Sequence, residues 1–244
     1  EEFSRFVSES NNSHSLSNDL IWSLCQDRAG TLWVGTFFGG IDKFDPGRAR
    51  FKPFVPEPDN APVRSEKSVG SIYWDESGTR WIGTPTGLAR FEHAAKQFSH
   101  LFNNSFNNNV NCIYGDFSPR GTLWIGTNGN GLYSIDHNTG KLTRFVYDPH
   151  NHYSISDSQI TAIHQDRFGI LWVGTFGGLN RFDREKRHFE RFLHDQNDPY
   201  SISNDVVMAI CEDSGSRNTL WLGTSNGQSF QHAEFFVNLL KDKI

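Results

Sequence analysis

Apolar and aromatic residues occur along this chain in short runs of four to seven residues, and turns rich in Gly, Asp and Asn separate the runs. One run, Leu32-Trp33-Val34-Gly35-Thr36, returns four more times in related form. The tryptophans of these five runs are spaced 48, 43, 48 and 49 residues apart. They are Trp33, Trp81, Trp124, Trp172 and Trp221. A fixed period of this length indicates a repeat architecture.

Each repeat predicts four strands. The first is an apolar run that closes on an acid, and the acids are Asp27, Asp75, Asp116, Asp166 and Asp213. A turn with Asp and Gly leads into the tryptophan strand, and a second Gly-rich turn leads into a third strand such as Leu179-Asn180-Arg181-Phe182. The fourth strand is typified by Phe189-Glu190-Arg191-Phe192. Because no stretch has a convincing helical period, each repeat is expected to be a four-stranded antiparallel meander.

The fourth strand indicates how the meanders pack. Its two aromatic positions are three residues apart and therefore point to opposite faces of the sheet, as expected for a sheet between two neighbours. Five such sheets arranged radially predict an all-β fold, a β-propeller of four-stranded antiparallel blades. A linear β-solenoid is the alternative, but its repeats are usually half as long.

The predicted blades form one domain, residues 1–244, with units at residues 19–54, 68–102, 109–145, 159–192 and 205–240. The N-terminal Phe3-Ser4-Arg5-Phe6 matches a fourth strand, so the chain is expected to open in mid-unit. This strand completes the last blade and closes a five-bladed ring, or the C-terminal tail supplies its own fourth strand. The third alternative is that the chain is a fragment of a larger propeller.

Composition narrows the function classes. The net charge is −5 and the basic residues are scattered, which argues against nucleic acid as a partner. No apolar run approaches the ~20 residues of a membrane helix, and no signal peptide is visible. The three cysteines each fall in a first strand, where we expect small buried side chains rather than a disulfide framework.

The repeated aspartates and tryptophans are expected to be scaffold. A catalytic carboxylate is needed once or twice, whereas an Asp before every turn accepts backbone N–H groups and fixes the turn. His150 and His152 have a His-x-His spacing but no further ligands nearby, so no metal site is expected. No nucleophile elbow, phosphate loop or dinucleotide fingerprint is present, and we expect neither cofactor nor catalytic residue.

Ligand-binding residues should instead be those that break the repeat, because a ligand has no fivefold symmetry. The turn after the tryptophan strand varies most, and its aromatic and amide groups would suit a sugar. The candidate ligand-binding residues are Phe37, Phe38, Thr86, Asn128, Asn130, Phe176 and Asn226. The alternative is that these residues only form solvent-exposed turns and bind no ligand.

The pattern Asp-x-x-Gly-x-Leu-Trp-Val-Gly-Thr followed by Gly-Gly-Leu-x-Arg-Phe-Asp resembles the two-component regulator propeller repeat. Residues 27–45 and 166–183 fit it, and the linker Ser-Ile-Ser-Asn-Asp at 201–205 is also similar to this family. Arg80 replaces the usual Leu in the second unit, Phe117 to Gly121 lengthens a turn in the third, and the last unit loses the Gly-Leu-x-Arg-Phe pattern.

The resemblance implies a non-catalytic, periplasmic sensory propeller of a bacterial hybrid two-component or histidine kinase-type protein. Such sensors usually have seven-bladed propellers, so the resemblance implies that five repeats are a fragment of a seven-bladed ring or end in a decayed unit. It implies an oligosaccharide or other small ligand and further signalling domains as partners, and it allows a dimer. The rival functions are a glycosidase-like propeller enzyme, which would need paired carboxylates across a cleft, and a structural fragment without its own ligand.

Overall fold

The structure is a computed structural model of the 244-residue chain. The residues that it describes are 3–27, 29–54, 68–75, 78–92, 97–100, 109–116, 121–136, 139–213, 219–225 and 233–238.

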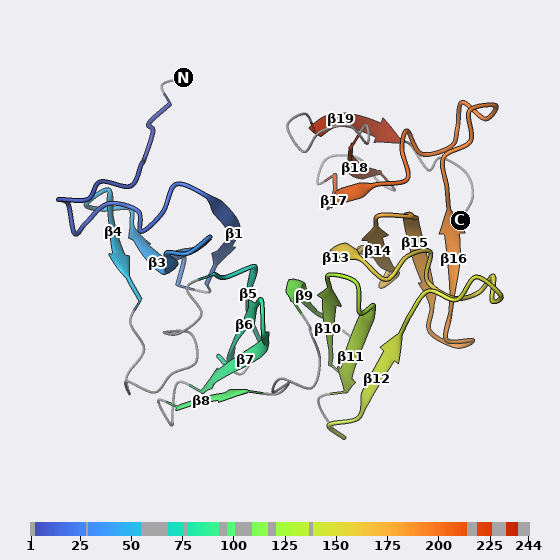
Figure 1. Cartoon of the computed structure of the whole chain (residues 1–244), viewed down its shortest axis with the longest axis horizontal. Coiled ribbons are helices and arrows are strands. Elements are labelled where there is room, and N and C mark those ends of the chain that lie inside the picture. Colours follow the sequence, from blue (N-terminus) through green and yellow to red (C-terminus); the bar gives the residue numbers. More distant parts are fainter. Residues whose placement is uncertain are drawn as a thin grey trace. The chain divides into compact units, whose positions relative to one another are not determined.

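The described residues form five antiparallel sheets and contain no helix (Figure 1). The first sheet contains β1 (Ile21–Gln26), β2 (Leu32–Thr36), β3 (Gly40–Asp45) and β4 (Arg50–Pro53). The second contains β5 (Ser71–Trp74), β6 (Arg80–Thr84), β7 (Gly87–Glu92) and β8 (Gln97–His100). The third contains β9 (Val110–Gly115), β10 (Thr122–Thr127), β11 (Leu132–Asp136) and β12 (Leu142–Phe145). The fourth contains β13 (Ile160–Gln165), β14 (Leu171–Thr175), β15 (Gly178–Asp183) and β16 (His188–Phe192), and the last contains β17 (Val207–Glu212), β18 (Leu220–Ser225) and β19 (Ala233–Asn238).

Within every sheet the strands pair in chain order, so each sheet is a meander. The tryptophan strand is always second. In the fourth sheet, for example, Trp172 pairs with His164 of β13 on one side and with Arg181 of β15 on the other. The predicted all-β fold of four-stranded antiparallel sheets is confirmed, and three strands of the last sheet are described.

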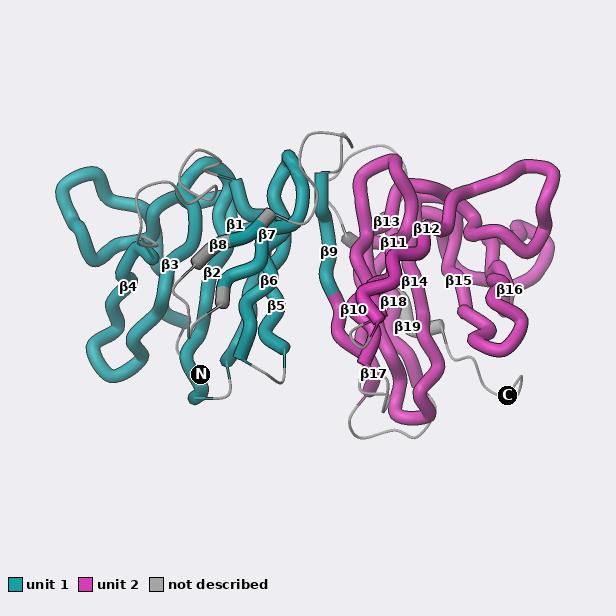
Figure 2. The backbone as a smooth tube through the Cα atoms, turned by 90° about the horizontal axis from the view of Figure 1, so that it is seen from below, with its two compact units in different colours: residues 1–113 teal, residues 114–244 magenta. Residues whose placement is uncertain are grey.

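The chain divides into two compact units, residues 1–113 and 114–244, each of which is described separately below (Figure 2). The boundary between the units lies within β9. Each predicted repeat contains one sheet, and the assignment of the whole chain to one propeller domain stays a prediction.

Buried apolar side chains join neighbouring sheets inside each unit. In the first unit one core cluster joins the first and second sheets, and its members are Trp33, Ile41, Val69, Ile72, Ile82 and Ala89. In the second unit the corresponding cluster joins the fourth and last sheets and consists of Trp172, Leu179, Ile202, Val207, Leu220 and Leu222. The tryptophan of the repeat therefore packs against the sheet that follows it.

The glycine of the Trp-x-Gly-Thr segment allows a neighbouring sheet to approach. A Cβ atom on Gly35 would lie 3.0 Å from Val69 Cγ1, and a Cβ atom on Gly174 would lie 3.0 Å from Val207 Cγ1. Because real Cβ contacts are rarely this short, the valine that begins the next sheet packs on bare backbone. The glycine is thus a packing residue at the junction between sheets.

The threonine of the same segment closes the turn that follows. The Thr36 hydroxyl donates to the Gly40 carbonyl at 3.0 Å, and the Thr175 hydroxyl donates to the Gly178 carbonyl at 2.9 Å. Both threonines are fully buried. The candidate ligand turns therefore start from a fixed anchor.

The Ser-x-Ser linkers dock on a buried polar residue in the third strand. Ser17 donates its backbone N–H (2.8 Å) and its hydroxyl (2.6 Å) to the carboxylate of Asp42. Ser156 donates its backbone N–H to the Asn180 amide oxygen at 2.9 Å, and the Asn180 amide donates to the Ser156 hydroxyl at 2.9 Å. Asp42 and Asn180 are both 0% exposed, so these side chains tie each linker to its sheet.

Residues 3–9 are not part of a strand. The Phe6 ring instead lies 5.3 Å from the Phe44 ring and 5.4 Å from the Phe51 ring of the first sheet. The pairing of this segment with the last blade, one of the three alternatives for the chain ends, is not tested by these contacts. The expectation of buried cysteines is wrong for Cys211, which is exposed, and Cys25 and Cys112 are half-buried.

Candidate ligand-binding site

In the first, second and fourth sheets the repeated aspartate holds the repeated tryptophan. The indole N–H donates to the carboxylate six residues earlier at 2.9 Å for Trp33 and Asp27, and at 2.8 Å for Trp172 and Asp166. The second sheet has the same bond between Trp81 and Asp75.

The other carboxylate oxygen of Asp27 accepts the backbone N–H groups of Ala29 and Thr31. Burial favours a raised pKa for Asp27, but the hydrogen bonds from Trp33, Thr31 and Ala29 outweigh burial and lower the pKa below its usual value. A carboxylate that is already used by the turn and the indole is a scaffold group.

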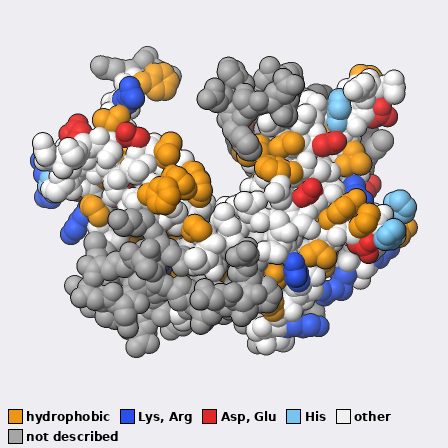
Figure 3. Space-filling view, in the orientation of Figure 1, with side chains coloured by type: hydrophobic (Ala, Val, Ile, Leu, Met, Phe, Trp, Pro, Cys, Tyr) orange, Lys and Arg blue, Asp and Glu red, His pale blue; other side chains and the backbone are white. Residues whose placement is uncertain are grey.

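Of the predicted ligand residues, Phe37 and Phe38 lie together in the turn between β2 and β3. Their ring centroids are 4.0 Å apart, and the Phe37 ring lies 4.6 Å from the Trp22 ring of β1. Trp22 is 48% exposed and Phe38 is 61% exposed. We call these three side chains the aromatic cluster; Figure 3 shows hydrophobic side chains gathered over β1.

Phe38 holds a backbone conformation that disfavours side chains. Its φ is +63°, whereas the corresponding turn of the third sheet has Gly129 there with a φ of +97°. A residue with a Cβ atom loses about 1–2 kcal/mol in this region. The turn is secured by hydrogen bonds from Phe38 N–H to the Ser68 hydroxyl (3.3 Å) and from Phe37 N–H to the Leu20 carbonyl (2.9 Å). Backbone strain of this kind is concentrated at functional sites.

Trp22 is presented by a β-bulge. The register of β1 on β2 shifts between Ile21 and Ser23, so Trp22 is the extra residue. Equivalent shifts place Thr161 and Met208 at the bulges of the fourth and last sheets. A bulge bends its strand and re-aims a side chain, and here the side chain meets the turn that carries Phe37.

Sequence reasoning missed Trp22, although a signal was available. The equivalent first-strand position differs in every repeat and is occupied by Trp22, Gly70, Asn111, Thr161 and Met208. The criterion that functional residues break the repeat would therefore have included this position as well as the turns.

The other predicted residues are placed less clearly for binding. Thr86 is exposed, and its hydroxyl lies 3.4 Å from the Thr84 hydroxyl. The guanidinium of Arg144 donates to the Asn130 carbonyl (2.9 Å) and to its side-chain oxygen (3.4 Å), so Asn130 holds its own turn.

Asn128 is exposed and forms an isolated bridge with Gln159, whose carbonyl also accepts the N–H of half-buried Phe176. Asn226 lies outside the described residues. The structure therefore brings only Phe37 and Phe38 of the predicted set into contact.

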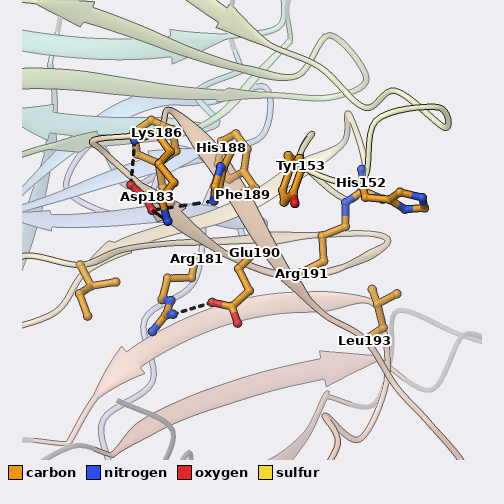
Figure 4. Close-up of a pocket in the computed structure, with 12 residues that line it drawn as sticks. His152, Tyr153, Arg181, Asp183, Lys186, His188, Phe189, Glu190, Arg191 and Leu193 are labelled. Atoms are coloured by element: carbon orange, nitrogen blue, oxygen red, sulfur yellow. Dashed lines mark hydrogen bonds and ion pairs between the residues drawn. The ribbon is translucent and has the colours of Figure 1, made fainter.

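A second feature, a cavity of about 720 Å³, lies at the β16 edge of the fourth sheet (Figure 4). The His188 ring stacks on Tyr153 at 4.7 Å, and its Nε2 lies 3.8 Å from Asp183. Below them, as drawn, Arg181 and Glu190 form an ion pair of 2.6 Å. Because these charges are paired, the cavity presents neighbouring donors and acceptors to a polar ligand.

Among the residues that the structure describes, no three His, Cys, Asp or Glu side chains are grouped to hold a metal ion. No helix in the described ranges is long and apolar enough to cross a membrane.

Comparison with known proteins places these features in a family context. Residues 15–38 and 154–177 match the family model described as two component regulator propeller. Each matched segment runs from a Ser-x-Ser linker through the tryptophan strand to the following turn, and the first one contains the whole aromatic cluster. No match was found among curated proteins.

Similar solved structures include two from B. thetaiotaomicron. The extracellular domain of the putative hybrid two component system BT3049 is 26% identical, with a TM-score of 0.72 over 91% of this chain and 28% of that one. The extracellular domain of the putative one component system BT4673 is 21% identical, with a TM-score of 0.69 over 90% of this chain and 28% of that one. The chain thus spans 28% of the length of either structure and has their propeller fold.

Propellers with other functions are also similar. Virginiamycin B lyase from Staphylococcus aureus has a TM-score of 0.60 at 12% identity, over 96% of this chain and 72% of that one. Likeness at this identity reflects the blade architecture alone, because unrelated functions are built on propellers.

Proposed function

We propose that this chain, which carries two component regulator propeller repeats, is a non-catalytic ligand-binding part of an extracytoplasmic sensor in a bacterial two-component signalling protein. The family match and the likeness to the extracellular domain of BT3049 support this proposal. The partners would then be the remaining signalling domains of the parent protein, with kinase or other output chemistry located in those domains.

We further propose an oligosaccharide as the ligand and the aromatic cluster as its contact. The observation that carries this assignment is the row of ring contacts from exposed Phe38, at a strained φ, through Phe37 to exposed Trp22 on a bulge. Flat aromatic faces bind the apolar C–H face of a sugar ring at low cost in side-chain entropy. A solvent-exposed turn without a ligand would have no reason to keep a phenylalanine where its equivalent is Gly129.

The rival function is a propeller enzyme. The similarity to a lyase favours it only at the level of fold. The carboxylates of Asp27, Asp75 and Asp166 are bonded to indole and backbone N–H groups. Asp116 pairs with an arginine, and the carboxylates of the cavity are ion-paired. Glycoside hydrolysis instead needs two carboxyl groups free to face the scissile bond.

The test is an oligosaccharide array followed by calorimetry on the 244-residue chain. Phe38→Gly should lower the affinity for any hit about tenfold or more, as for loss of a central aromatic contact, and should leave the protein at least as stable. Trp22→Ala should weaken binding similarly. Phe168→Ala is the matched control, because Phe168 is 57% exposed and lies outside the aromatic cluster.

Two results would overturn the proposal. Equal affinity of wild type and Phe38→Gly would remove the aromatic cluster from the binding site. Turnover of an oligosaccharide that one carboxylate substitution abolishes would replace the sensor with an enzyme.

A further inference from the structure

At a small crevice between the third and fourth sheets, the repeat's Asp–Trp bond is exchanged for another contact. Asp116 occupies the position of Asp27 and Asp166, but its side chain, 0% exposed, pairs with Arg184 at 2.5 Å. The indole N–H of Trp124, in a side chain that is 2% exposed, has no hydrogen-bond partner. A buried donor without an acceptor is rare and calls for a ligand, ion or water.

The Trp124 ring forms part of the wall of this crevice, whose volume is about 170 Å³. Water takes about 30 Å³, and pockets for drug-sized molecules measure about 300–1,000 Å³. The crevice therefore has room for a small ion or for one group of a larger ligand. Phe145 and Phe182 complete the apolar part of the wall.

The polar part of the wall is strongly cationic. Lys141, Arg184 and Arg187 line the crevice, and Asp136 is the single carboxylate among the described lining residues. Within the described part of the chain, Lys141 and Arg187 have no ion-pair partner. This excess of positive charge stands in a chain whose net charge is −5.

The Arg187 guanidinium is held at the crevice by its surroundings. It donates to the Thr143 hydroxyl at 3.4 Å and lies 5.7 Å from the Phe145 ring centroid. A guanidinium has five N–H groups, so several remain for an anion. Positioning by a hydroxyl and a ring reduces the entropy lost when such an anion binds.

The backbone of Arg187 is also strained. Its φ is +56°, and in the equivalent hairpin of the third sheet the residue is Gly140 with a φ of +67°. The first sheet has Ala49 there, with a φ of +50°. The left-handed conformation is thus common to the three hairpins, and Arg187 differs from the other two residues in its long cationic side chain. Like Phe38, Arg187 places a large side chain at a left-handed position that glycine occupies in another sheet, and backbone strain of this kind is concentrated at functional sites.

We propose that this crevice binds a small oxyanion group, such as a sulfate or phosphate, between Lys141, Arg184 and Arg187. Arg and Lys are the usual ligands of such groups, and Arg matches them with parallel N–H donors. The Thr122, Ser134 and Thr143 hydroxyls in the wall add neutral donors. The group could belong to a free inorganic anion or to an anionic sugar, and the experiment separates these sources.

The experiment uses thermal shift and calorimetry on the 244-residue chain with sodium sulfate and sodium phosphate. Sodium chloride at matched ionic strength controls for screening. We expect saturable binding of sulfate or phosphate and a rise in melting temperature that chloride does not produce. A sulfated or phosphorylated monosaccharide that binds more tightly than the inorganic ion would identify a sugar-borne group as the source.

Arg187→Gly and Lys141→Ala should each lower the affinity about tenfold or more, as for loss of a charge-assisted hydrogen bond. Arg187→Gly should not lower the melting temperature of the ligand-free protein, since the variant relieves a left-handed arginine. Lys52→Ala is the matched control, because it removes one exposed positive charge from the first sheet, which contributes no residue to the crevice.

Trp124→Phe separates a site from simple charge attraction, because it removes the indole N–H without changing the charge and should also weaken binding. Sulfate and phosphate effects equal to those of chloride would overturn the proposal. Unchanged affinity in Arg187→Gly, or an equal loss in Lys52→Ala, would do so too. A negative result for the oxyanion site would not contradict the proposed ligand contact at the aromatic cluster, because Phe38→Gly tests that cluster separately.

Discussion

The Trp172 indole N–H donates a 2.8 Å hydrogen bond to the Asp166 carboxylate at the start of the preceding hairpin. The other oxygen of the same carboxylate accepts the backbone N–H groups of Phe168 and Ile170, each at 2.9 Å. One side chain therefore fixes a turn and orients the largest buried ring of its sheet. This arrangement gives a physical reason for the interval of six residues between Asp and Trp in the first, second and fourth repeats.

Asp166→Asn should lower the free energy of unfolding by about 1–3 kcal/mol. An amide has one acceptor oxygen where the carboxylate has two, so either the indole or the turn must face an N–H group. Urea unfolding measures the loss. Asp45→Asn is the control, because Asp45 accepts only the Gly47 N–H at an exposed turn and should change stability by less than about 0.5 kcal/mol. Equal stability of both variants would contradict the assigned role.

Gly35→Ala should destabilise the first unit by about 1–3 kcal/mol through overpacking. The new Cβ atom would meet the Ser23 hydroxyl oxygen and Val69 Cγ1 at 2.2 and 3.0 Å. Gly47→Ala is the matched control, since its Cβ atom would meet only the Asp45 carboxylate at 3.4 Å. Thermal unfolding of the two variants checks the prediction, and a Gly35→Ala protein as stable as wild type would refute the packing role.

Asp42→Asn should remove a pH dependence of stability. Burial raises the pKa of Asp42 above the usual 3.8, although hydrogen bonds from Ser17 oppose the rise. The folded protein then holds this proton more tightly than the unfolded chain does. Its unfolding free energy consequently falls as pH rises from 3.8 through the folded pKa. Asn cannot ionise, so the variant should escape this fall and be more stable than wild type at pH 7.

Urea unfolding between pH 4 and pH 7 measures the difference between the two proteins. The reciprocal variant, Asn180→Asp, should acquire the same fall in stability, because Asn180 occupies the equivalent buried position against Ser156. Parallel pH profiles for wild type and Asp42→Asn would show that Asp42 is not the source.

Arg80→Ala should cost about 2–4 kcal/mol, whereas Arg80→Leu should stay within about 1.5 kcal/mol of wild type. The guanidinium lies 4.3 Å from the Trp74 ring centroid and 5.0–5.2 Å from those of Trp33, Phe91 and Phe54. Burial lowers the pKa of Arg80, which shows that the charge is desolvated. Leu fills the same space without that cost.

Equilibrium unfolding of the two Arg80 variants measures both values. A loss in Arg80→Leu as large as that in Arg80→Ala would show that the four rings require the cation itself rather than its volume.

The strands and their order could be predicted from the sequence because the tryptophan segment repeats both residue type and spacing. Phe37 and Phe38 could be singled out because they break that repeat. Trp22 also breaks the repeat, and the same criterion predicts it when first-strand positions are compared as well as turns.

Other features depend on contacts that no local pattern encodes. Asp116 pairs with Arg184 instead of Trp124, and this ion pair forms only where two sheets meet. The left-handed backbone at Phe38 and Arg187 is invisible in the sequence, because such positions are predicted only where glycine stands. The crevice lined by Lys141 and Arg187 was therefore beyond prediction, since its residues come from separate hairpins of two sheets.

The contact between Gly35 and Val69 has a counterpart between Gly174 and Val207. Neighbouring sheets are thus joined by the same kind of contact at both junctions. Both junctions join a bare stretch of backbone to a valine. Duplication of one unit within a gene would thus create a working junction at once, with no compensating substitution. Propellers built this way can gain or lose blades during evolution while their turns diverge toward new ligands.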